Sequence, residues 1–177
     1  MAVIRASYTK AGAGGASSAK EGLRYGMHRA DAGGDQQYRE VYDRNGTLSK
    51  QEAYDRIDQA EQGGGRYYYR LTLNQGQGHG QVDMQAWTRD VMGELEQRHG
   101  RPVEWLAVEH KDHSQHDHVH VIAVTSKTLS KADLAALRTE ADQSWERHAE
   151  QVRDWHGAEQ VQGQNRGQER YGYGPER

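Results

Sequence analysis

The sequence has 177 residues, of which 34% are hydrophobic and 28% are charged, so it fits one domain with a small core and not a two-domain enzyme. The absence of cysteine excludes disulfides, thiolate metal ligands and thiol nucleophiles. The formal net charge of -3 argues against a protein that coats nucleic acid through bulk positive charge. Residues 1–30 nevertheless carry a net charge of +4, which predicts a local basic surface near the N-terminus.

Hydrophobic periodicity divides the chain into strands and helices. The clearest strand, residues 66–73, alternates so that Tyr67, Tyr69, Leu71 and Leu73 share one face. The predicted elements in chain order are a strand at 3–9, a helix capped by Ser17 or Ser18 and ending at Gly33, a polar helix at 49–62, the strand at 66–73, a helix at 84–99, strands at 103–110 and 118–125, and a helix at 130–155.

This order predicts an α+β fold with a central, mainly antiparallel β-sheet packed with helices. The strands at 103–110 and 118–125 are joined by a polar loop and should form a hairpin. We place the domain at residues 1–156 and expect residues 157–177, which are rich in Gly, Gln and Arg, to form a flexible tail. No segment approaches the ~20 apolar residues that span a bilayer, so we expect a cytoplasmic protein without a membrane segment.

Five of the ten histidines fall between His110 and His120. Side chains alternate along a strand, so His118 and His120 should project from one face about 7 Å apart. If the two strands pair, His110 can complete a three-histidine metal site with coordination positions left open for water or substrate. His116 lies on the same face as His118 and His120 and is an alternative third ligand.

Two segments resemble a known family. Residues 105–110 and 118–122 resemble the third motif of mobilisation-type conjugative relaxases, which belong to the HUH endonuclease superfamily. Residues 20–25, ending in Tyr25, lie where that family carries its nucleophilic tyrosine on an N-terminal helix after a Gly-rich stretch. One departure is Asp117, because the family usually has proline immediately before the His-x-His pair.

The resemblance spans residues 2–155 and implies an RRM-like palm, the HUH relaxase fold, in which the sheet carries the histidine triad and a helix brings the tyrosine over it. It implies a metal-dependent enzyme that nicks and rejoins one DNA strand at an origin of transfer and so starts conjugative transfer or mobilisation. Tyr25 would attack the phosphate and form a 5′-phosphotyrosine, and His110, His118 and His120 would hold a divalent ion, Mn or Mg first, with Zn, Ni or Co as alternatives.

The implied partners are single-stranded DNA at an origin of transfer, accessory DNA-binding proteins and a type IV secretion coupling protein. The protein would be bacterial and could be translocated with the transferred DNA. Two rival interpretations stay open. One is a rolling-circle replication initiator or transposase of the same superfamily, and the other is a non-catalytic DNA-binding protein that a metal stabilises.

Several other residues are candidates for supporting roles. His28, one helical turn after Tyr25, is a rival nucleophile because some relaxase branches use histidine. Asp112 or Glu40 could orient a ligand histidine or accept the tyrosine proton. The weaker candidate nucleophiles are Tyr8, Tyr38 and Tyr42. The residues expected to contact DNA are Arg5, Lys10, Lys20, Arg24 and Arg29.

Overall fold

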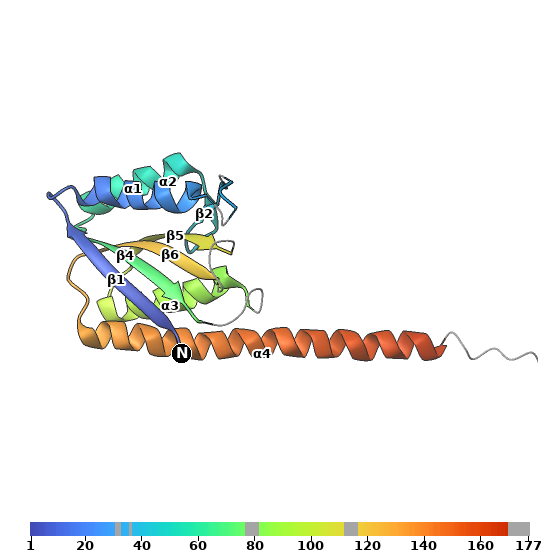
Figure 1. The fold of residues 1–177 in the computed structure, drawn as a ribbon. Coiled ribbons are helices and arrows are strands. Elements are labelled where there is room, and N and C mark those ends of the chain that lie inside the picture. The colour runs from blue at the N-terminus through green and yellow to red at the C-terminus, as the bar shows by residue number, and fades with distance from the viewer. Residues whose placement is uncertain (31–32, 36, 77–81, 112–116, 170–177) are drawn as a thin grey trace, which may run out of the picture.

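The structure is a computed structural model that describes residues 1–30, 33–35, 37–76, 82–111 and 117–169. A sheet lies between two helices on one face and two on the other (Figure 1). The strands are β1 (Val3–Lys10), β2 (Val41–Tyr42), β3 (Thr47–Leu48), β4 (Tyr67–Asn74), β5 (Glu104–His110) and β6 (His118–Thr125). The helices are α1 (Gly15–His28), α2 (Lys50–Gln62), α3 (Met84–His99) and α4 (Lys131–Glu169).

The six strands form one sheet in the order β1-β4-β6-β5-β2-β3, and every neighbouring pair is antiparallel. The predicted hairpin is present, with His110 opposite His118 and Val108 opposite His120. The predicted fold class is therefore confirmed: the chain is α+β, and its helix-packed antiparallel sheet is consistent with an RRM-like palm.

Each face of the sheet has its own hydrophobic core. On the face covered by α1 and α2, Leu106 and Ile122 of the sheet pack with Leu23, Met27 and Ile57 of the helices. The residues that define the core on the opposite face, under α3 and α4, include Leu71, Leu73, Trp87, Val91, Leu95, Trp105, Val121, Leu137 and Trp145. The even-numbered residues of β4, β5 and β6 thus face α1, which decides the side on which the histidines lie.

The start of α2 agrees with the prediction. Ser49 caps it in a capping box, because its hydroxyl accepts from the backbone N–H of Glu52 at 3.2 Å and the Glu52 carboxylate accepts from the Ser49 N–H at 2.8 Å.

The predicted bounds of α1 are wrong at both ends. The helix begins at Gly15, before Ser17 and Ser18, and Gly14 precedes it with a left-handed backbone and no side-chain cap. It ends at His28 and not at Gly33. The early end has a physical cause: the backbone N–H of Arg39 donates to the carbonyl of Met27 at 2.9 Å, and the Arg39 guanidinium donates to the carbonyl of Arg29 at 2.7 Å. A returning segment therefore satisfies carbonyls that a longer helix would have used.

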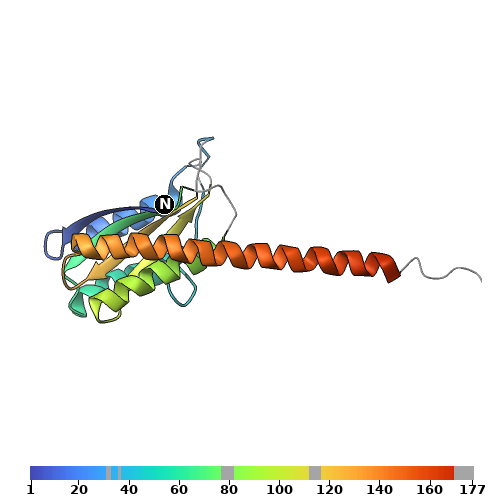
Figure 2. The same cartoon turned by 90° about the horizontal axis from the view of Figure 1, so that it is seen from below.

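Three further elements differ from the sequence-based expectation. Strands β2 and β3 lie in a segment expected to be loop, and β2 pairs with β5. Each has only two residues, too few to show a periodic pattern. Helix α4 continues to Glu169 and does not end at Trp155, so the first part of the expected tail is helical. Figures 1 and 2 show this part of α4 projecting beyond the sheet.

Within the part of the chain that the structure describes, none of the helices combines the length and the apolar character that a bilayer span requires.

The capping box of α2 can be tested against the predicted cap of α1. We expect Ser49→Ala to lower the free energy of unfolding by about 1 kcal/mol, because the Glu52 N–H loses its acceptor. Ser17→Ala should change it by less than about 0.5 kcal/mol, because Ser17 is exposed inside α1. Urea unfolding measures both values. An equal loss in the two variants would contradict the start of α1 at Gly15.

The first turn of α4 predicts a stability change in acid. Hydrogen bonds from the Ser130 hydroxyl and N–H, together with Arg98, lower the pKa of Asp133 from 3.8 to about 2. A pKa that folding lowers contributes stability above 3.8, and this contribution is lost as the pH falls toward 2. The free energy of unfolding of Asp133→Asn should therefore depend less on pH across this interval than that of the wild type, as urea midpoints would show. Parallel curves for the two proteins would contradict it.

Candidate metal centre and the groove beside it

Three histidines meet at one end of the β5–β6 hairpin. His110 ends β5 opposite His118, and His120 lies two residues further along the same face of β6. The ring centroids are 5.1 Å apart for His110 and His118, 4.8 Å for His110 and His120, and 5.1 Å for His118 and His120. One ring nitrogen from each lies within 4.8 Å of the others. The predicted triad is therefore assembled, and it could hold a metal ion.

The surroundings of His120 suit a metal ligand. Its Nδ1 lies 3.4 Å from the hydroxyl of Thr72. Its Nε2 is buried and, among the residues that the structure describes, has no hydrogen-bond partner. Burial first, and then the charges of His118, Arg29 and Arg39, lower the pKa of His120 to about 4. The imidazole is thus neutral at physiological pH, which is the form that binds a metal, so the triad fits a divalent ion.

Helix α1 lies directly over the triad. A Cβ added at Gly26 would stand 3.7 Å from Nε2 of His110 and 3.7 Å from Cβ of Val108. Helix α1 therefore passes close to His110 at Gly26, and the residue before Gly26 is Tyr25. Tyr25 is 60% exposed, and the guanidinium carbon of Arg29 lies 5.6 Å from its ring centroid.

Tyr25 and one histidine of the triad, His120, line the same groove. The groove has a volume of about 320 Å³ and lies between α1 and the exposed side of β1, β4 and β6. The side chains that line it include Arg5, Ser7, Tyr25, Arg70, Thr72 and His120. A candidate nucleophile, a candidate metal ligand and two cations thus share one space, which is an arrangement suited to a phosphate ester.

The five basic residues predicted to contact DNA lie in different places. Arg5 lines the groove, whereas Arg24 and Arg29 border a second hollow of about 510 Å³ beside Tyr25. The Lys20 ammonium lies 2.6 Å from the carboxylate of Asp58 on α2. Lys10 is the last residue of β1 and does not line the groove.

The rival nucleophiles are less well placed than Tyr25. His28 is exposed in the second hollow, with its ring centroid 5.5 Å from that of Tyr38. Tyr42 is 1% exposed, its hydroxyl lies 3.1 Å from that of Thr88, and burial raises its pKa above the usual range. The ring of Tyr8 packs against Tyr67 and Tyr69 on the face away from the triad.

The carboxylate candidates stay untested. Asp112 and the alternative ligand His116 lie outside the described residues. Glu40 is exposed just before β2, and among the described residues no hydrogen bond or ion pair joins it to a triad histidine. Asp117, which stands where the family usually has proline, is buried. The pKa of Glu109 is raised, mainly by burial, and the nearby Asp117 carboxylate contributes to this rise.

The sequence patterns did not single out Arg70 or Thr72. Alternation along β4 does place Arg70 and Thr72 on the face of the triad, because Tyr69 and Leu71 face α3 and α4. What could not be read from the sequence is the pairing of β4 with β6, which sets Thr72 opposite His120.

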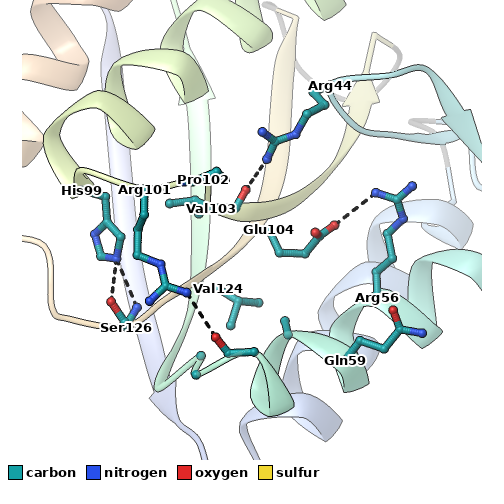
Figure 3. A pocket seen from close by; sticks show the side chains of 14 residues that line it. Arg44, Arg56, Gln59, His99, Arg101, Pro102, Val103, Glu104, Val124 and Ser126 are labelled. Atoms are coloured by element: carbon teal, nitrogen blue, oxygen red, sulfur yellow. Dashed lines mark hydrogen bonds and ion pairs between the residues drawn. The ribbon is translucent and has the colours of Figure 1, made fainter.

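A further hollow of about 260 Å³ lies at the opposite end of β5 from the triad (Figure 3). Its three arginines already have partners within the protein. Arg44 forms an ion pair with Glu96 and Arg56 with Glu104, and Arg101 donates a hydrogen bond to the backbone carbonyl of Gly63, just after α2. These bonds join the turn between β2 and β3 to α3, α2 to β5, and the segment after α3 to the end of α2. The arginines thus have a structural role, and the hollow is a weaker candidate site than the groove.

No protein-family model matches this chain, and a search of curated proteins found no match either. The case for function therefore depends on the geometry of the triad, the groove and Tyr25.

The triad predicts a metal affinity that one histidine can remove. We expect the wild type to bind Mn(II) or Zn(II), and His120→Ala to weaken binding at least about 100-fold, because a ligand is lost outright. His148→Ala is the matched control, because His148 bonds to Asp90 on α3, away from the triad. Isothermal titration calorimetry measures both affinities. An unchanged affinity in His120→Ala would exclude the triad as the site.

Proposed function

We propose that the chain is a metal-dependent nickase of the relaxase type, which cuts and rejoins one DNA strand at an origin of transfer and so starts conjugative transfer. The observation that carries this proposal is the groove that contains both Tyr25 and His120. A nucleophile and an activating centre within reach of one substrate atom are what covalent catalysis at phosphorus requires.

The first requirement is to overcome the charge of the substrate. A phosphodiester resists attack because its negative charge repels a nucleophile. When bound to His110, His118 and His120, a divalent ion would supply Lewis-acid polarisation of the scissile phosphate and offset the charge that develops there. Mn or Mg is our first choice, although imidazole ligands bind Zn, Ni and Co more tightly than Mg. Arg5 and Arg70 add positive charge from the sheet.

The second requirement is an accessible nucleophile. The exposed ring of Tyr25 can meet a strand lying in the groove. Its phenolic oxygen would form a bond to phosphorus while the bond from phosphorus to the 3′ oxygen breaks, and the phenolic proton would pass to the departing oxygen. The products are a 5′-phosphotyrosine and a 3′-hydroxyl. The ester linkage is exchanged and not hydrolysed, so the reverse reaction rejoins the strand without ATP.

The proposed partner is single-stranded DNA at an origin of transfer. The open groove and the cations beside Tyr25, namely Arg24 and Arg29, support a strand that runs along α1. Accessory DNA-binding proteins and a type IV secretion coupling protein follow from the family resemblance alone.

The proposal predicts a covalent adduct that depends on one tyrosine. Incubation of the wild type with Mn(II) and single-stranded oligonucleotides tiling its own plasmid or element should give a protein–DNA adduct on a denaturing gel. Tyr25→Phe and EDTA should each abolish it, because one removes the attacking oxygen and the other the metal. Tyr38→Phe should retain it, and this is a matched control because Tyr38 is also 60% exposed.

Two other outcomes would change the conclusion. An adduct that survives Tyr25→Phe would move the nucleophile to His28 or another tyrosine. No adduct with any strand, despite metal binding by the triad, would favour a non-catalytic DNA-binding protein that the metal stabilises.

A further inference from the structure

Two arginines, Arg5 and Arg70, line the groove. Strand pairing sets Arg5 opposite Thr72 and Ser7 opposite Arg70, so both arginines lie on the face of the triad. Among the described residues, no carboxylate forms an ion pair with either one. Arginines that do pair with carboxylates are Arg44, Arg56, Arg98 and Arg147. The groove therefore attracts an anion, whereas these other arginines are largely neutralised within the protein.

Arg70 is held in place from above by α1. Its Nη2 donates to the hydroxyl of Ser18 at 3.0 Å. A Cβ added at Gly22 would lie 3.2 Å from Cδ of Arg70 and 3.6 Å from Cδ1 of Ile122. Gly22 thus leaves room for the aliphatic part of Arg70 to pass under the helix. The other N–H groups of the guanidinium remain available for a ligand in the groove, since Ser18 is its one hydrogen-bond partner in the described structure.

Arg70 also lies beside the candidate metal centre. It is opposite Ile122 on β6, so His120 is its diagonal neighbour. Diagonal positions in an antiparallel pair are about 7–8 Å apart. One extended DNA strand could therefore touch both residues, with different phosphates at each. The planar guanidinium matches two oxygens of a phosphate and is suited to this contact.

We propose that Arg70 binds the phosphate that neighbours the scissile one and holds the strand in register between the triad and Tyr25. The inference rests on the proposed nickase function and names a residue that touches its substrate. A contact to phosphate positions the strand and does not read its sequence. The loss of Arg70 should therefore weaken binding of all strands by a similar factor.

The first test measures binding without cleavage. Every protein in this test also carries Tyr25→Phe, so that the DNA is bound but not cut. The probes are the single-stranded oligonucleotides of the adduct screen, labelled with fluorescein. Fluorescence anisotropy measures the dissociation constant at several salt concentrations. Arg70→Gln should weaken binding about tenfold and reduce the salt slope by ~0.7, the value for one phosphate contact. Arg66→Gln is the matched control, because Arg66 is exposed just before β4, outside the groove, and loses the same charge.

Two additional variants separate a phosphate contact from a loss of folding. Arg70→Lys keeps the charge but not the planar fork, so the salt slope should return while adduct formation, measured with Tyr25 restored, stays slow. Gly22→Ala leaves every charge in place but presses on Cδ of Arg70, and should also weaken binding. Thermal unfolding by circular dichroism confirms that each variant is folded.

The second test locates the phosphate. Each phosphate around the cleavage site is replaced in turn by a neutral methylphosphonate, with Tyr25 intact, and the rate of adduct formation is measured. Replacement of the phosphate next to the scissile one should slow the wild type and have no further effect in Arg70→Gln, because the two changes remove the same contact.

Equal salt slopes and equal rates for Arg70→Gln and Arg66→Gln would overturn the assignment of Arg70. Additive effects of Arg70→Gln and every methylphosphonate would overturn it as well. If the wild type forms no adduct with any strand, the nickase function fails, and the salt slopes still decide whether Arg70 binds phosphate.

Discussion

The register between β5 and β6 is the constraint on which the rest of the site depends. Because side chains alternate along a strand, a slip of β5 by one residue would turn His110 to the opposite face, away from His118 and His120. Both faces of this hairpin are buried, with Leu106 under α1 and Trp105 toward α3 and α4. A slip would exchange these two unequal side chains between cores of different shape. The packing of both cores thus specifies the register that assembles the triad.

The parts of the site that sequence could predict are those set by local pattern. Alternation alone places His118 and His120 on one face, and a short loop brings His110 to them. The groove depends instead on contacts between distant segments. Arg70 meets the site because β4 lies between β1 and β6, and α1 stops at His28 because Arg39 takes its terminal carbonyls. No local periodicity encodes such pairings, so the triad was predictable, whereas the place of Arg70 beside it was not.

The charge of the groove differs in sign from the net charge of the chain. The whole chain has a net charge of -3, yet the groove is lined by Arg5 and Arg70 without a compensating carboxylate in the described residues. Arg29 and Arg39 lower the pKa of His120, although burial lowers it more. Arg29, which is expected to contact DNA, thus adds to the effect of burial that keeps the imidazole in its ligating form.

The contact at Gly26 limits the side chain that this position of α1 can hold. A Cβ there would stand in ordinary van der Waals contact with both Nε2 of His110 and Cβ of Val108. An alanine therefore fits, whereas a larger side chain would have to push α1 away from β5. Because Tyr25 is the adjacent residue, such a displacement would move it as well. The size of residue 26 thus bears on the distance between the tyrosine and the triad.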